Sequence, residues 1–212
     1  MLEHVDGRLA STRLKVSQGD ALFRAGDRFD SLFAVWTGFF KTVLTTAQGR
    51  EQVTGFEMAG DLLGLDGIYA DRHAVDAIAL EDSQVCVIPF GALQSLAREE
   101  PMLQQRLHRL MSLEIVSDHR AMLHLGSMYA EERLAVFLLD LAARLEARGY
   151  SGSSLLLRMS RAELGSYLGL KLETVSRTLS RFQANGLLHV SHREVRITDP
   201  EGLRRVLEGA PL

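Results

Sequence analysis

The sequence contains a single cysteine, Cys86, among 212 residues. No intramolecular disulfide can form, and a zinc finger, which needs several cysteine or histidine ligands, is excluded. No apolar run approaches the roughly 18 residues that a membrane-spanning helix requires, and residues 1–16 lack the basic start and apolar core of a signal peptide. With 46% hydrophobic and 24% charged residues, the composition is typical of a globular protein. We therefore expect a cytoplasmic protein that does not engage a membrane.

The net charge of −3 by itself disfavours a nucleic-acid-binding protein, but the charges are unevenly distributed. Residues 1–128 carry 12 basic and 17 acidic side chains, whereas residues 158–196 carry 7 basic and 3 acidic ones. Because salt screens charges beyond roughly 10 Å, a local basic segment matters more for phosphate binding than the total charge. The asymmetry favours residues 158–196 as the segment that contacts a nucleic acid.

Residues 13 to about 97 have the pattern of short strands separated by turns. Glycines recur at the spacing of about 8–12 residues that is typical of a β-sandwich or barrel. They are Gly19, Gly26, Gly38, Gly49, Gly60 and Gly67. Apolar or β-branched runs of strand length lie between them, at Leu32–Trp36, Lys41–Thr46 and Gln84–Ile88. This pattern predicts a β domain over residues 1–100 that holds a ligand or serves as a scaffold.

From Pro101 to about Leu125 the hydrophobic period becomes helical. One set of positions alternates in steps of four and three residues, as in the seam of a two-stranded coiled coil. It comprises Gln104, His108, Met111, Ile115, Asp118, Met122 and Leu125. We predict a dimerisation helix over residues 101–126, weakened at Asp118 because a buried carboxylate facing its copy is repulsive. A second apolar face could pack on the strands, and one wide stripe buried in a single core remains the alternative.

A helix-turn-helix is predicted over residues 160–186, after a helix at Ala130–Arg148. Ser160 and Glu163 form a capping box that starts a first short helix, which ends at Gly169. A second helix runs from about Leu172 to Asn185 and stops before a glycine. Two short helices joined by a glycine-containing turn of three or four residues make up this motif.

The second helix has two faces. Val175, Leu179 and Phe182 face inward, whereas the opposite face is polar. Arginine can bond guanine at two atoms, glutamate accepts from cytosine N4 and serine serves either sign, so Glu173, Ser176 and Arg177 are the predicted base-reading residues. Lys171, Thr174 and Arg181 suit phosphates. Taken alone, the pattern fits equally well a solvated helix in which Glu173 and Arg177 form an ordinary ion pair.

The residues that follow favour DNA binding. Leu187–Ser191 and Val195–Thr198, joined through His192-Arg193-Glu194, predict a β-hairpin. A helix-turn-helix followed directly by a hairpin is the winged form of the motif. Arg193 and Arg196 would add phosphate contacts from the hairpin.

A β domain, a long dimer helix and a winged helix-turn-helix together resemble the CRP/FNR family of bacterial regulators, over nearly the whole chain. The resemblance is sharpest to the FNR branch, whose recognition helix carries Glu-x-x-Ser-Arg, here Glu173–Arg177. Other similar stretches are Gln52–Phe56, Gly60–Leu62, Val85–Phe90, Ala130–Leu134 and Tyr167–Leu170.

The resemblance implies an α+β protein with three parts. These are a cyclic-nucleotide-binding-like sensor domain over residues 1–100, folded as a double-stranded β-helix (jelly-roll), a dimerisation helix over 101–126 and a winged helix-turn-helix domain over 127–212. It further implies a homodimer on palindromic DNA with TTGAT-like half-sites, contact with RNA polymerase and a response to oxygen or redox state. The regulated genes, the signal and the sign of regulation stay open.

Three positions depart from the family pattern. Cyclic-AMP-binding relatives hold the nucleotide with a glutamate and an Arg-Ser pair, but Leu65 stands at the glutamate's place and Arg72 has no serine after it. Cyclic-nucleotide binding is therefore not expected. Lys171 replaces a capping threonine, and its charge opposes the helix dipole but suits a phosphate.

FNR-type sensors hold a four-iron four-sulfur cluster with four cysteines, three from an N-terminal cassette and one from the β domain. Cys86 matches the last position, so it is a candidate iron–sulfur ligand only if a cassette precedes it. We expect this chain alone to bind no such cluster and a longer native form to do so. A cluster-free relative, or a buried structural thiol at Cys86, is the alternative.

Two rival functions have residue requirements that the sequence can be compared with. A cupin-like metalloenzyme needs clustered histidine and carboxylate ligands, but His73 is the only histidine in the predicted strand region beyond residue 13. No Ser/His/Asp set, P-loop or dinucleotide-binding glycine pattern is present, so an enzyme is not expected. A regulator of the same architecture that senses haem, nitric oxide or another small ligand remains the alternative.

Overall fold

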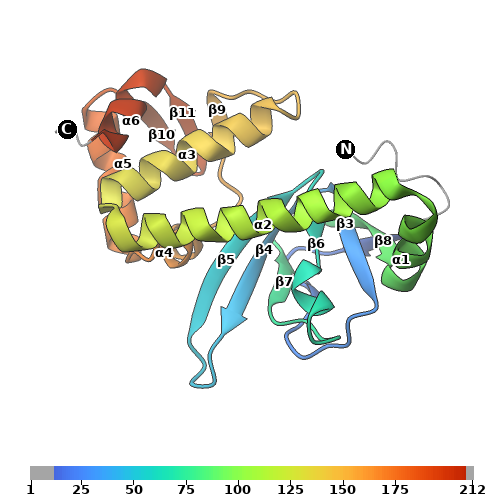
Figure 1. Ribbon diagram of the computed structural model, residues 1–212. Helices are drawn as coiled ribbons and strands as arrows, with labels where there is room; N and C mark the ends of the chain where they lie inside the picture. Colours follow the sequence, from blue (N-terminus) through green and yellow to red (C-terminus); the bar gives the residue numbers. More distant parts are fainter. Residues whose placement is uncertain (1–11, 209–212) are drawn as a thin grey trace. The chain divides into compact units, whose positions relative to one another are not determined.

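The structure is a computed structural model that describes residues 12–208. The chain divides into two compact units, with the boundary between Asp118 and His119 (Figure 1). That boundary falls inside a helix, so the predicted division at residues 100 and 126 stays a prediction. Among the described residues, no helix is both long and apolar enough to cross a membrane.

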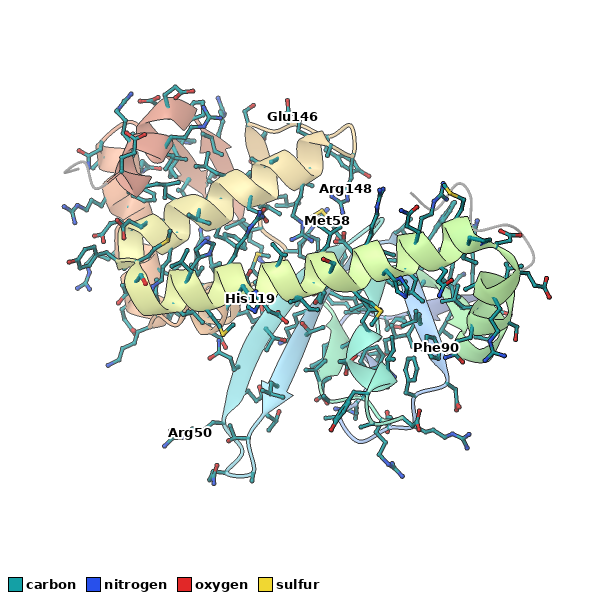
Figure 2. The ribbon with its side chains drawn as sticks, in the orientation of Figure 1. Arg50, Met58, Phe90, His119, Glu146 and Arg148 are labelled. Atoms are coloured by element: carbon teal, nitrogen blue, oxygen red, sulfur yellow. The ribbon has the colours of Figure 1, made fainter. Side chains whose placement is uncertain are left out.

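The first unit contains two four-stranded antiparallel sheets, with strand orders β1-β8-β3-β6 and β2-β7-β4-β5. The strands are β1 Thr12–Val16, β2 Ala21–Phe23, β3 Ser31–Thr37, β4 Phe39–Thr45, β5 Glu51–Met58, β6 Leu62–Leu63, β7 Asp76–Ala79 and β8 Ser83–Pro89, with a 3-10 helix η2 at Leu65–Ile68. This arrangement confirms the predicted α+β, jelly-roll type of β domain. β4 and β5 pair along most of their length as a long hairpin, and Arg50 lies at its turn (Figure 2).

The strands bury their alternate side chains in two apolar clusters. Val35, Phe40 and Val85 are fully buried in the first cluster. Cys86 lies in the second cluster, with Leu32. Alternation of this kind is expected of strands packed face to face across a core.

The prediction that strands continue to about residue 97 was wrong. Helix α1 occupies Phe90–Glu99 and begins at Phe90 (Figure 2), directly after β8. Leu93 and Ala97 are buried four residues apart, which is the period of a helix and not of a strand. Leu93 belongs to the second apolar cluster, where Phe90 contacts Phe29 edge-on at 5.0 Å between ring centroids.

Helix α2 runs from Pro101 to Ser127, one residue beyond the predicted end at 126, and contains no buried residue. Leu103 and Leu107 pack against the second cluster, as the second apolar face led us to expect. All seven residues of the predicted seam are exposed in the single chain. The alternative prediction, one wide apolar stripe buried in a single core, therefore does not describe this helix.

The second unit packs helices against a three-stranded sheet of order β10-β11-β9. Its elements are α3 Ala130–Glu146, β9 Ser154–Leu156, α4 Arg161–Leu168, α5 Leu172–Ala184, β10 Leu188–Ser191, β11 Glu194–Ile197 and α6 Pro200–Leu207. Leu138, Leu164, Phe182 and Leu203 are fully buried in its core.

Two elements of this unit, β9 and α6, were not among those predicted from the sequence. Helix α6 has a clear start signal, because Asp199 accepts a hydrogen bond from the Gly202 N–H at 2.8 Å and Pro200 follows at the first helical position. Strand β9 is only three residues long, and it is defined by its pairing with β11. Such pairing is not visible in a short apolar run.

Candidate nucleic-acid interface

The helix-turn-helix is built as predicted. Ser160 Oγ accepts the Glu163 N–H at 3.2 Å, and the Glu163 carboxylate accepts the Ser160 N–H at 2.7 Å. Gly169 ends α4 in the left-handed conformation, with φ 63°, which favours glycine. The Leu170 N–H then donates to the Gly165 carbonyl at 2.8 Å, so the turn folds back onto α4.

Gly165 makes this close approach possible. A Cβ at Gly165 would lie 2.7 Å from the Leu170 carbonyl oxygen and 3.5 Å from the Leu172 nitrogen. The backbone that leads into α5 therefore lies directly against α4, and any larger residue would push the start of α5 away. The role of Gly165 was not predicted, because a glycine inside a short helix gives no indication in the sequence of which backbone approaches it.

Helix α5 has the two predicted faces. Val175, Leu179 and Phe182 are buried, and so is Thr178, which was not predicted. On the other face Glu173 and Arg177 are exposed, and Ser176 is partly buried. The structure describes both charged side chains, and no ion pair joins Glu173 to Arg177. The alternative, a solvated helix with an ordinary ion pair between Glu173 and Arg177, is therefore not supported by such a contact.

The predicted phosphate-contacting residues lie on three elements. Lys171 is exposed at the N-cap of α5, where its side chain makes no capping hydrogen bond, and Thr174 in the first turn is partly buried. Arg193 and Arg196 are exposed on the β10–β11 hairpin. Arg181 differs from the others, because its guanidinium pairs with the Glu131 carboxylate at 2.9 Å.

Arg161 joins the helix-turn-helix to the hairpin and was missed by sequence analysis. Its guanidinium donates to the His192 carbonyl at 3.0 Å. Burial lowers the pKa of Arg161 from its ordinary value, yet an arginine remains charged at neutral pH. His192 itself has φ 53° at the turn between Ser191 and Glu194. A charged hydrogen bond thus joins the turn of the hairpin to the first residue of α4, in addition to the pairing of β11 with β9.

An iron–sulfur cluster and a cyclic nucleotide each require particular side chains in the first unit. Cys86 is 8% exposed within an apolar cluster, and no group of three histidine, cysteine or acidic side chains that could hold a metal ion occurs in the described part of the chain. Cys86 is the one cysteine of the sequence, whereas such a cluster is usually held by four cysteine thiolates. Leu65 packs against the same cluster, and Arg72 donates to the Gly26 carbonyl at 2.6 Å, so neither replaces the nucleotide-binding residues that are missing.

The contacts of His73 explain why this histidine is buried. Its ring stacks on Phe23 with centroids 3.7 Å apart, and Nδ1 lies 3.4 Å from a carboxylate oxygen of Asp66. The other oxygen of Asp66 accepts the N–H of Ala74 at 2.7 Å. His73 is thus buried against an aromatic ring and a backbone-bound carboxylate.

Comparison with known proteins agrees with this architecture. Residues 13–100 match the cyclic nucleotide-binding domain family and residues 132–206 match the Crp-like helix-turn-helix domain family. The chain is 44% identical to the transcriptional regulatory protein Btr of Bordetella pertussis, covering 94% of this chain and 82% of that protein. It is 48% identical to the transcriptional activator protein Anr of Pseudomonas aeruginosa, covering 87% and 75%.

Among solved structures, FixK2 from Bradyrhizobium japonicum superposes with a TM-score of 0.86 at 28% identity, covering 95% of this chain and 98% of that chain. Relatives of this kind are transcription regulators and not enzymes. The two domain families, the winged helix-turn-helix and the similarity over most of the chain lead to one assignment: the chain is a DNA-binding transcription regulator of the CRP/FNR family, in its FNR-like branch.

Proposed function

We propose that the chain acts in the cytoplasm as a homodimer on palindromic DNA with TTGAT-like half-sites, contacts RNA polymerase, and works in an oxygen or redox response. The observation that carries the proposal is the outer face of α5, where Glu173 and Arg177 are exposed while the opposite face is buried. A helix held by its apolar face and free on its polar face can enter a major groove.

Each base-reading residue has a defined chemical partner in such a half-site. Arg177 would donate two hydrogen bonds to O6 and N7 of the guanine, and Glu173 would accept from N4 of a cytosine. Ser176, whose hydroxyl both donates and accepts, suits a neighbouring base. Lys171, Thr174, Arg181, Arg193 and Arg196 would contact phosphates around the groove, which sets the register and the affinity but not the sequence preference.

The dimer is supported by the exposed seam of α2. Met111, Ile115, Met122 and Leu125 are between 37% and 62% exposed, and a row of apolar side chains at coiled-coil spacing is stabilised when a second copy covers it. A two-fold dimer presents two copies of α5, which need half-sites about one helical turn apart, some 34 Å. Palindromic DNA meets this requirement.

The redox response is proposed from the relatives' names alone. Similar proteins include the fumarate and nitrate reduction regulatory protein of Salmonella typhimurium, at 45% identity. Because one cysteine cannot hold a four-iron four-sulfur cluster, we propose that this chain by itself takes up none. A visible absorption spectrum after anaerobic incubation with iron and sulfide tests this, and a stable iron–sulfur band would contradict it.

The DNA-binding proposal is tested by fluorescence anisotropy with a labelled palindrome. Binding should weaken when the guanine of each half-site is replaced, and Arg177→Ala should lose about 1–3 kcal/mol at that position and no longer distinguish the replaced base. Arg204→Gln is the control, since it removes the same charge from α6, where Arg204 pairs with Glu201 on its own helix. Equal affinity of wild type and Arg177→Ala for both DNAs would refute the assignment.

A further inference from the structure

Residues Ala130–Arg133 begin helix α3. Each of the three charged residues among them makes a hydrogen bond or an ion pair with another residue. Glu132 accepts the Tyr129 N–H at 2.6 Å and so caps α3 itself. Glu131 pairs with Arg181 of α5 at 2.9 Å. Arg133 makes three hydrogen bonds, more than either glutamate, and all of them go to backbone carbonyls at or beside the ends of other helices.

The three bonds of Arg133 connect different elements of the second unit. Nη2 donates to the Leu125 carbonyl in the last turn of α2 at 2.8 Å. Nε donates to the Met128 carbonyl, between α2 and α3, at 2.9 Å. Nη1 donates to the Leu168 carbonyl, at the last residue of α4, at 3.0 Å. One guanidinium therefore joins the end of the long helix to the end of the first helix of the motif.

Carbonyls at the end of a helix suit an arginine for two reasons. The last four carbonyls of a helix have no partner within it, and the partial negative charge there attracts a cation. A guanidinium is planar and rigid, so its donors reach acceptors on several sides at fixed angles, whereas a lysine ammonium is a compact charge on a flexible stem. The geometry of Arg133 thus depends on an arginine and not only on a positive charge.

The same joint is closely packed. A Cβ at Gly169, the residue after Leu168, would lie 2.9 Å from Cδ2 of Leu125 and 3.2 Å from Nη1 of Arg133. The turn of the helix-turn-helix therefore rests on the last turn of α2 with no space between them. Because the backbone after Gly169 leads directly into α5, a movement of the end of α2 cannot leave this turn in place.

We propose that Arg133 is the positioning residue that fixes the recognition helix to the end of α2, so that a displacement of that end is transmitted to α5. The proposal rests on the function of α5 in DNA binding, but the joint itself can be measured without DNA. In general, two sites are coupled when each of them favours one of two arrangements of an element that connects them.

The test measures a distance across the joint. Spin labels are placed at Arg120 on α2 and Ala184 on α5, both exposed, in a chain whose buried Cys86 is replaced by alanine. Pulsed electron resonance then gives the distance distribution, with unlabelled protein in excess so that only distances within one protomer are measured. Arg133→Gln should broaden the distribution and weaken binding to the palindrome about tenfold. Arg204→Gln, the matched control, should change neither.

A second variant distinguishes the geometry of the guanidinium group from its positive charge. It also provides the test if Arg133→Gln does not fold. Arg133→Lys keeps the charge but should still broaden the distribution, because one ammonium on a flexible stem cannot hold three carbonyls at fixed angles. A narrow, wild-type distribution in either variant, with circular dichroism showing a folded protein, would overturn the proposal. If the wild type failed to bind the palindrome, the proposed function would fail while the distances still tested the joint.

Discussion

The guanidinium of Arg181 lies 2.9 Å from the carboxylate of Glu131. A cation that sequence analysis assigned to a DNA phosphate is thus already paired within the protein. The pair is half-exposed, with 53% of the Arg181 side chain and 29% of the Glu131 side chain accessible. Such a pair stabilises the fold by less than about 1 kcal/mol, so a phosphate can compete for Arg181.

Glu131→Gln should therefore strengthen DNA binding, because it releases Arg181 from its carboxylate partner. If Arg181 contacts a phosphate, the magnitude of the slope of log affinity against log salt should rise by about one. Anisotropy titrations at several salt concentrations measure this slope. The double variant Glu131→Gln with Arg181→Gln should lose the gain, and a slope that is the same in all three proteins would remove Arg181 from the set of phosphate contacts.

Gly165→Ala should destabilise the second unit by about 1–3 kcal/mol, because the added methyl group meets the Leu170 carbonyl in a packed turn. Urea unfolding followed by circular dichroism measures the change. Gly126→Ala is the matched control, since a Cβ there has nothing within 4 Å and alanine favours a helix. Destabilisation of both variants to the same degree would mean that the close approach at Gly165 is not the cause.

Asp118→Ala should tighten the dimer by removing a carboxylate that faces its copy in the α2 seam. Asp118 is exposed in the single chain, so the fold of the chain should not change. Sedimentation velocity over a range of concentrations measures the dimer dissociation constant, which should fall severalfold. Ser117→Ala, one position outside the seam, should leave it unchanged. A weaker dimer in Asp118→Ala would argue against this seam.

Acid should destabilise the fold through His124. Burial lowers the pKa of His124 from its ordinary 6.5, the Asp140 carboxylate opposes this shift, and the Arg120 guanidinium adds to it. The unfolded chain therefore binds the proton more tightly, and stability is lost as the pH falls below 6.5 toward the lower folded-state pKa.

His124→Gln should reduce this loss, and Asp140→Asn should increase it, because the carboxylate that favours the charged imidazole is gone. Urea midpoints measured at pH values on both sides of 6.5 give the pH dependence of the free energy of unfolding. Identical dependence in wild type and His124→Gln would show that another group is responsible.

Local patterns predicted much of the second unit. The capping box at Ser160, the stop at Gly169 and the buried positions Val175 and Phe182 were found where expected, because caps and helical periodicity depend on residues only a few positions apart. Helix α1 was missed because its short apolar stretch follows a strand without a cap signal. Its N-cap, Pro89, makes no side-chain hydrogen bond.

The sequence by itself determined the succession of a β domain, a long helix and a winged helix-turn-helix, the two faces of α5 and, through them, the class of protein. Only the tertiary structure decided which contacts orient that helix. Arg133 lies in the stretch Ala130–Leu134, which resembles the family pattern. The sequence alone indicates no role for this arginine. Its three acceptors, at Leu125, Met128 and Leu168, are backbone carbonyls that every residue type carries. No pattern of side chains can reveal such acceptors, because it is folding that brings the ends of two helices to one guanidinium.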